Sequence, residues 1–189
     1  PKVIDFGMAK ALGQQLTEKT LHTGFGQMLG TPLYMSPEQA GGSSFDVDTR
    51  SDIYSLGVLL YELLTGQTPF ARETLRSVGV DEMRRMIREV DPPRPSTRVS
   101  SLHAEALSTV SDCRRIEPRH LSQQLSGELD WIVMKALEKD RTARYGTPDS
   151  LAADLQCYLD DRPVRACPPS LAYRLRKFVY RKRSLLTML

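Results

Sequence analysis

The stretch "DTRSDIYSLGVLLYELLTG" at residues 48–66 carries the strongest helix signal in this chain. Its apolar residues cover nearly every side of a helix, and Gly66 marks its end. A helix that is apolar all round is either buried at the centre of a domain or spans a membrane. This run is too short for a span and carries Asp52 and Glu62, so it predicts a buried central helix over residues 48–64.

Further helices are expected on the C-terminal side of this one. Residues 81–90 bring four apolar side chains to one face at helical spacing. Residues 128–138 and 147–159 predict two more helices. The last of them begins with Thr147 as N-cap and Pro148 at the first helical position, where the fixed φ of proline and its missing N–H suit a helix start.

The other segments lack sustained periodicity. Residues 1–6 predict a short strand, and residues 7–47, which are rich in Gly, Thr, Ser and Pro, predict a long ordered loop of the kind that is usually functional. Residues 97–126 are polar and weakly patterned, which indicates an insertion or a mobile stretch. The expected fold class is therefore mainly α.

Composition narrows the class of protein. The chain has 189 residues, of which 40% are hydrophobic and 26% charged, as in an ordinary globular domain with a core of its own. Its 3 cysteines lack C-x-x-C spacing. The absence of that spacing argues against a metal knuckle and a disulfide framework, and it fits a reducing compartment.

Four short signatures follow one another along the chain. They are "DFG" at residues 5–7, "GTPLYMSPEQA" at residues 30–40, "SDIYSLGVLLYELLTGQTPF" at residues 51–70 and "KALEKDRTARY" at residues 135–145. In this order the chain resembles the second half of the C-terminal lobe of a eukaryotic-type protein kinase. It is most similar to bacterial serine/threonine protein kinases, in which a Ser-Pro-Glu such as Ser36-Pro37-Glu38 often replaces Ala-Pro-Glu. The resemblance covers about residues 1–165.

This resemblance implies the helical C-terminal lobe of a kinase fold. Residues 1–165 would be a partial kinase domain, with an activation segment at residues 5–38 and the later helices of the lobe at residues 48–160. The Gly-rich loop, the strand Lys and the H-R-D catalytic loop precede the D-F-G motif in the family, and this chain contains none of them. The chain is therefore expected to be a fragment without the small lobe and the catalytic loop. Its parent protein would transfer the γ-phosphate of ATP to protein Ser or Thr, whereas the fragment alone would be inactive.

The D-F-G motif is the expected cofactor site. Phosphoryl transfer needs positioning and neutralisation of the phosphate charges, and Mg²⁺ supplies much of that neutralisation. Mg²⁺ binds one or two carboxylates beside phosphate oxygens. By its match to the family motif, Asp5 is expected to hold Mg²⁺ on ATP, with Phe6 setting its orientation and Gly7 allowing the turn. For the triplet alone, a turn Asp that caps a loop is the alternative.

Four threonines have expected roles in the activation segment. The resemblance implies that Thr31 contacts the protein substrate and the catalytic groups, which indicates the serine/threonine class; a turn Thr is the alternative. Thr23, then Thr20, and also Thr17 are candidate phosphorylation sites. A phosphate adds charge and strong acceptors that an Arg cluster can use to order a loop. A solvated polar loop is the alternative for these three.

Three charged residues are expected to be structural. Glu38 and Arg144 match an ion pair of the family that ties the end of the activation segment to the later helices, and removing one partner of such a buried pair strands a charge. Asp52 is predicted to be a buried acid, which must be paired or hydrogen-bonded. The resemblance implies that Asp52 caps the catalytic loop, so in this chain it is expected to be partly without partners.

The tail at residues 166–189 is strongly basic. Residues 171–189 hold six Arg and Lys residues and no acid, so they carry +6, and the net charge of +3 leaves −3 for the rest of the chain. A polybasic stretch before an apolar run beginning near residue 184 predicts a cytoplasmic juxtamembrane segment at the inner membrane. A plain amphipathic surface helix is the alternative, and no nucleic-acid partner is expected.

Two functions are compatible with these motifs. The first is a serine/threonine kinase that uses ATP and Mg²⁺ and acts on protein substrates. The second is a pseudokinase or scaffold that keeps the lobe without catalysis. Intact Asp5 and Thr31 favour the first, because a scaffold has no use for a Mg²⁺ ligand.

Overall fold

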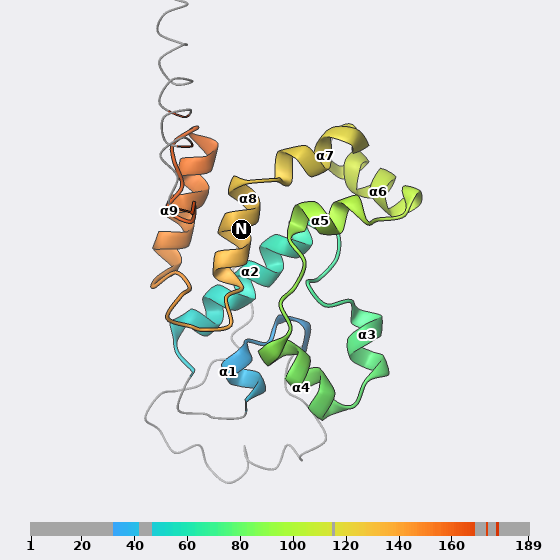
Figure 1. Ribbon diagram of the computed structural model, residues 1–189, viewed down its shortest axis with the longest axis vertical. Helices are drawn as coiled ribbons and strands as arrows, with labels where there is room; N and C mark the ends of the chain where they lie inside the picture. The colour runs from blue at the N-terminus through green and yellow to red at the C-terminus, as the bar shows by residue number, and fades with distance from the viewer. Residues whose placement is uncertain (1–31, 42–46, 115, 169–172, 174–176, 178–189) are drawn as a thin grey trace, which may run out of the picture. The chain divides into compact units, whose positions relative to one another are not determined.

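The computed structural model describes residues 32–41, 47–114, 116–168, 173 and 177 (Figure 1). All regular secondary structure within these residues is helical, which confirms the mainly α fold class. In chain order the elements are the 3-10 helix η2 (Pro32–Tyr34) and the α-helices α1 (Pro37–Ala40), α2 (Thr49–Thr65), α3 (Arg72–Ser77), α4 (Val80–Glu89), α5 (Pro95–Ser100), α6 (Ala104–Arg114), α7 (Pro118–Leu125), α8 (Glu128–Ala136) and α9 (Pro148–Leu159). The strand expected at residues 1–6 lies outside the described residues. So does most of the loop expected at residues 7–47, of which the structure describes residues 32–41 and 47.

Both ends of α2 are set by residues that the sequence identifies. Asp48 is the N-cap, and its carboxylate accepts a hydrogen bond from the backbone N–H of Arg50 at 2.8 Å. At the other end Gly66 has φ 75°, a left-handed conformation that favours glycine, and its N–H donates to the carbonyl of Glu62. The helix predicted over residues 48–64 is therefore right to within one residue at each end.

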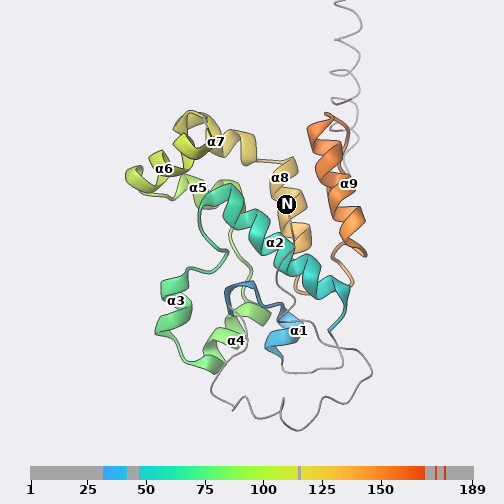
Figure 2. The ribbon, with the colours of Figure 1, turned by 180° about the vertical axis from the view of Figure 1, so that it is seen from behind.

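The long helix α2 is the element around which the others pack. It contacts α5, α8 and α9, and α8 and α2 lie side by side in both views (Figures 1 and 2). At their crossing, a Cβ on Gly57 would lie 2.8 Å from the Cβ of Ala136. Because that distance is shorter than real Cβ contacts, this close approach of α2 and α8 requires a glycine.

Two groups of buried side chains surround α2. The first joins α2 to α5, α7 and α8 and contains Tyr54, Val58, Tyr61, Leu64, Val99, Leu121, Leu125, Leu129, Val133 and Leu137. The second joins α2 to α8, α9 and the segment after α9 and contains Ile53, Ile132, Ala136, Tyr145, Leu151 and Val164. Fully burying one large aliphatic side chain stabilises a fold by about 1.5–3 kcal/mol, so these groups supply the main favourable term.

The prediction that α2 is buried on nearly every side is wrong. Leu56, Leu59 and Leu63 are 41%, 43% and 59% exposed. They follow one another at i, i+3 and i+7, so they form one apolar stripe along the helix. A helix with apolar residues on every side can bury any of its faces. In this structure the neighbouring helices cover the other faces of α2 and leave this stripe exposed.

Of the two alternatives predicted for residues 97–126, an insertion or a mobile stretch, the mobile stretch is wrong. This part of the chain forms most of α5 and all of α6 and α7. Val99, Leu121 and Leu125 are 1%, 1% and 3% exposed, so the segment contributes to the core. α5 buries Val99 and α7 buries Leu121 and Leu125, whereas the apolar side chains of α6 are at most partly buried, which leaves too weak a pattern for periodicity to detect.

Two other predicted helices are confirmed. In α4, Met83 and Ile87 are buried as their spacing indicates. In α9, Thr147 is the N-cap and Pro148 occupies the first turn. A capping box with Ser150 completes the start of α9, because each of the two side chains accepts a hydrogen bond from the backbone N–H of the other residue.

Leu121→Ala tests whether residues 97–126 belong to the core. Leu121 is 1% exposed, and deleting a fully buried leucine leaves a cavity. We expect the free energy of unfolding to fall by about 2–5 kcal/mol, measured by urea unfolding followed by circular dichroism. Leu159→Ala is the matched control; Leu159 is 72% exposed, so the expected change is within about 0.5 kcal/mol. Equal changes in the two variants would contradict the packing described.

Candidate functional site

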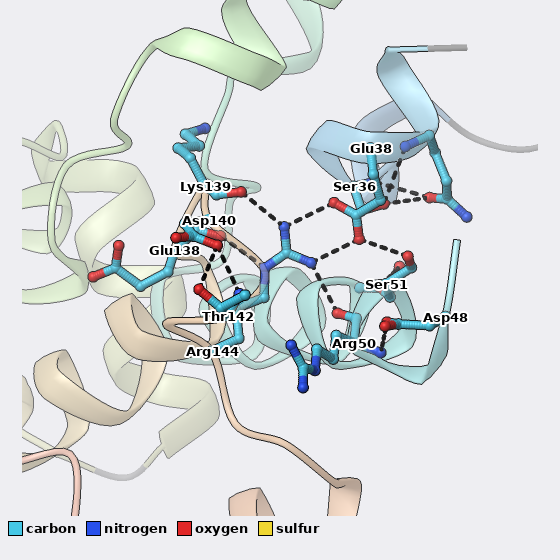
Figure 3. A network of polar contacts seen from close by, with 12 residues as sticks. Ser36, Glu38, Asp48, Arg50, Ser51, Glu138, Lys139, Asp140, Thr142 and Arg144 are labelled. Atoms are coloured by element: carbon cyan, nitrogen blue, oxygen red, sulfur yellow. Dashed lines mark hydrogen bonds and ion pairs between the residues drawn. The ribbon is translucent and has the colours of Figure 1, made fainter. Parts of the chain in front are cut away.

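A buried ion pair ties the segment that contains the Ser-Pro-Glu motif to the helices that follow it. Glu38 lies in α1, and Arg144 lies between α8 and α9 (Figure 3). Their charged groups meet side by side, with 2.8 Å from Nη1 to Oε1 and 2.8 Å from Nη2 to Oε2. The side chain of Arg144 is 0% exposed and that of Glu38 is 9% exposed. The structure thus brings together the two residues that the sequence pairs.

Every N–H of the Arg144 guanidinium has an acceptor. Besides the two bonds to Glu38, Nε donates to the carbonyl of Glu138 at 2.7 Å. Nη1 donates to the carbonyl of Arg50 at 3.0 Å, and Nη2 donates to the carbonyl of Lys139 at 3.2 Å. A guanidinium has five such donors, so this buried cation is fully hydrogen-bonded, which is the condition for tolerating it in a protein interior.

The carboxylate of Glu38 is held in its ionised form. The hydroxyl of Ser51, in the first turn of α2, donates to Oε1 at 2.6 Å. Burial by itself would raise the pKa of Glu38, but the hydrogen bonds from Arg144 and Ser51 outweigh it and lower the pKa from 4.5 to about 2. Glu38 is therefore charged at every ordinary pH.

The ion pair is not the only anchor of this segment. Ser36 is the N-cap of α1 and forms a capping box with Gln39, in which the Ser36 N–H donates to Oε1 at 2.9 Å. Tyr34 is attached to α2 twice. Its carbonyl accepts from the hydroxyl of Ser55 at 2.8 Å, and its own hydroxyl donates to the carboxylate of Glu62. Residues 34–39 are therefore attached to α2 from its first turn to its last.

Asp52 does not lie where the sequence predicts. It is exposed, so the prediction of a buried acid is wrong. Asp52 lies in the first turn of α2, where a carboxylate is stabilised by the positive end of the helix dipole and by water. The next residue, Ile53, faces the core, and an acid one position away on a helix faces in a different direction.

Lys139 makes long-range contacts that the sequence does not reveal. Its Nζ donates to the carbonyl of Ile87, in the last turn of α4, at 2.7 Å. The same Nζ lies 5.1 Å from the ring centroid of Phe70. Burial lowers the pKa of Lys139 from 10.5 to about 8, although the nearby carboxylate of Asp91 acts in the opposite direction. Lys139 lies within the motif at residues 135–145, but nothing in the neighbouring sequence indicates that its side chain contacts Ile87 and Phe70.

Asp154 is a buried acid outside the predicted set. It is 0% exposed and accepts three hydrogen bonds. These come from the hydroxyl of Tyr145 at 3.0 Å and from the backbone N–H groups of Arg165 and Ala166 at 2.7 and 2.9 Å. Asp154 therefore fixes the chain after α9 to the turn before it. The available signal was an acid three residues after Leu151, on the apolar side of a predicted helix.

Tyr173 and Lys177, the described residues among 171–189, contact the helices. Tyr173 is 6% exposed, and its ring lies edge-on to that of Trp131 with 5.3 Å between the centroids. The Nζ of Lys177 lies 2.9 Å from Oε1 of Glu128 and 3.3 Å from Oδ1 of Asp161. The start of the tail is therefore attached to α8 and to the end of α9.

Several predicted site residues lie outside the described part of the chain. They are Asp5, Phe6 and Gly7 of the cofactor site, Thr31 of the substrate site and the candidate phosphorylation sites Thr17, Thr20 and Thr23, together with the apolar run near residue 184. Within the described residues, no three His, Cys, Asp or Glu side chains are grouped so that they could hold a metal ion. The described helices also include none that is long and apolar enough to cross a membrane.

Comparison with known proteins gives consistent matches. A family model described as "Protein kinase domain" matches residues 1–155. The serine/threonine-protein kinase PknB of Mycobacterium tuberculosis is 38% identical over 168 residues, which cover 87% of this chain and 21% of PknB. A Streptomyces coelicolor protein named "Probable serine/threonine-protein kinase SCO3848" is 35% identical over 165 residues, which cover 87% of this chain and 20% of that protein. The chain spans about one fifth of the length of these curated relatives.

Arg144→Ala tests the structural role of the ion pair. The change leaves the buried carboxylate of Glu38 without its counter-charge, so we expect a loss of about 3–5 kcal/mol in the free energy of unfolding, a lower melting temperature and faster proteolysis near residues 32–41. Arg85→Ala is the matched control, since Arg85 forms exposed, solvent-screened ion pairs on α4 and its loss should leave the melting temperature nearly unchanged. An unchanged melting curve for Arg144→Ala would remove the structural role.

Acid titration tests the charge state of Glu38. The pKa of Glu38 is lowered from 4.5 to about 2 on folding, so the unfolded chain binds the proton more readily between these values. The contribution of Glu38 to stability is complete above about pH 4.5 and is lost as the pH falls towards 2. We expect Glu38→Gln to lower stability at pH 6 and to have a shallower decline than the wild type on acidification, measured by urea unfolding. Parallel declines would contradict the lowered pKa.

Proposed function

This chain belongs to the protein kinase family, and on that basis we propose that the protein containing it transfers the γ-phosphate of ATP to serine or threonine side chains of protein substrates. One structural observation carries most weight. The Glu38–Arg144 pair, bonded at 2.8 Å through both oxygens, ties the segment after Thr31 to the turn between α8 and α9. Phosphoryl transfer depends mainly on positioning, so a substrate-binding segment with a rigid attachment suits that chemistry.

The serine/threonine class has two supports. Thr31 follows Gly30 in the run that leads into η2, at the position where the family uses a Thr to contact the substrate. The relatives named above are serine/threonine-protein kinases by name. We assign the same substrate class to this protein.

Asp5 is the proposed ligand for Mg²⁺ on ATP. A carboxylate suits this hard cation, and the metal when bound neutralises part of the phosphate charge. Asp5 would hold the metal, Phe6 would set the direction of its side chain, and Gly7 would allow the turn. The chain contains no H-R-D run, so we propose transfer for the parent protein and none for residues 1–189 alone.

The proposed activation segment and tail would control when and where transfer occurs. Phosphate on Thr23, or on Thr20 or Thr17, would add negative charge to a segment that already contains Lys19 and His22. Residues 1–165 would be the cytoplasmic kinase part. Residues 166–189 would approach the inner membrane, because their basic side chains are attracted to anionic lipids.

Asp5→Ala in the parent protein tests the proposed activity. We expect phosphate transfer from labelled ATP to a generic substrate such as myelin basic protein to fall by at least about a hundredfold, because a metal-bound charge is worth several kcal/mol in the transition state. Asp112→Ala is the control, since Asp112 is an exposed acid on α6 and should leave transfer unchanged.

The outcomes separate the kinase from the scaffold. Mg²⁺-dependent transfer that survives in Asp5→Ala would refute the role of Asp5. A parent protein without any transfer activity would favour the pseudokinase or scaffold. Residues 1–189, assayed in parallel, should show no transfer above background.

A further inference from the structure

We propose that Lys139 is a positioning residue that links the Glu38–Arg144 ion pair to α4 and so holds α1 and α4 in one arrangement for binding a protein substrate. The part that concerns substrate rests on the proposed kinase function. The link from Arg144 to α4 rests on contacts alone and is tested separately.

The first link is made by the main chain. The guanidinium that binds Glu38 also donates to the carbonyls of Glu138 at 2.7 Å and of Lys139 at 3.2 Å. Figure 3 shows the carbonyl of Lys139 directed at Arg144 while its side chain extends the other way. The position of the Lys139 backbone is therefore set by the ion pair.

The second link is made by the side chain. Nζ of Lys139 donates to the carbonyl of Ile87 at 2.7 Å. Ile87 lies in the last turn of α4, whose final carbonyls have no partner within the helix. A cation at this end also complements the negative end of the helix dipole. Lys139 therefore caps the C-terminal end of α4 from another part of the chain.

Aromatic rings hold the ammonium in place between these links. Nζ lies 5.1 Å from the ring centroid of Phe70, after α2, and 6.0 Å from that of Tyr54, in α2. The guanidinium of Arg144 lies over the same Tyr54 ring at 5.1 Å. Cations over ring faces are attracted more strongly where water is excluded, and Tyr54 is 1% exposed. Arg144 and Lys139 are therefore positioned by one shared ring.

The helix that Lys139 caps packs on the substrate-side segment. α4 contacts α1, and the two lie side by side in both ribbon views (Figures 1 and 2). α1 holds Glu38 and follows the run that contains Thr31. The contacts close a ring from α1 through Glu38, Arg144 and Lys139 to α4 and back to α1. Such a ring restrains α1 and α4 together, which neither pair of contacts does alone.

Hydrogen exchange in the parent protein tests the link. Lys139→Met keeps the apolar stem and removes the ammonium, so backbone amides at residues 86–90 should exchange about tenfold faster or more, as expected for losing a hydrogen bond from a charged group. Lys139→Arg keeps a cation and should restore most of the protection. Lys135→Met is the matched control: the Lys135 ammonium also lies over an aromatic ring, Tyr145, at 4.9 Å, but on α8. Unchanged exchange in Lys139→Met, or equal acceleration in Lys135→Met, would overturn the proposal.

Steady-state kinetics test the substrate part. With myelin basic protein as the probe, Lys139→Met should raise KM for the protein substrate about tenfold while KM for ATP stays the same. A fall in kcat with both KM values unchanged would overturn the role in substrate binding. Faster exchange at α4 in a parent protein that has no transfer activity would support the link and refute the proposed function.

Discussion

The arrangement of the described helices depends on one buried cation. The guanidinium of Arg144 is excluded from water, so each of its five N–H groups needs an acceptor, and an unmet one would cost free energy. The acceptors come from three places in the sequence: the carboxylate of Glu38, the carbonyl of Arg50, and the carbonyls of residues 138 and 139. Satisfying Arg144 therefore brings α1, the start of α2 and the turn after α8 to one point.

The need to satisfy Arg144 and its partner Glu38 also explains the central position of α2. Its first turn supplies Ser51 to the Glu38 carboxylate, and one turn later Tyr54 lies under two cations. Beyond that, Gly57 lets α8 approach closely enough to deliver the turn that carries Arg144. The helix thus combines the polar anchor at one end with the apolar core along its length.

The buried side chain of Asp154 plays the corresponding part on the C-terminal side. Asp154 joins the hydroxyl of Tyr145 to the backbone N–H groups of Arg165 and Ala166. Because Tyr145 directly follows Arg144, the turn before α9 is held on one side by the buried guanidinium of Arg144 and on the other by the buried side chain of Asp154. The chain that leaves α9 then continues to Tyr173, which packs on Trp131 of α8. Both the segment before α2 and the tail after α9 are thus attached to one framework.

Local sequence determined the features that depend on neighbours along the chain. Asp48, Gly66 and Thr147 mark helix ends because caps act within a turn, and the order of four motifs identified Glu38 and Arg144 as partners 106 residues apart. Tertiary structure alone decided the features that depend on which surface meets which. The exposed stripe of Leu56, Leu59 and Leu63, the burial of Leu121 and the exposure of Asp52 follow from where other helices pack, which composition does not encode. The bonds of Lys139 and Asp154 to distant backbone groups depend on the tertiary structure in the same way, because a backbone N–H or C=O is present whatever the side chain at that position.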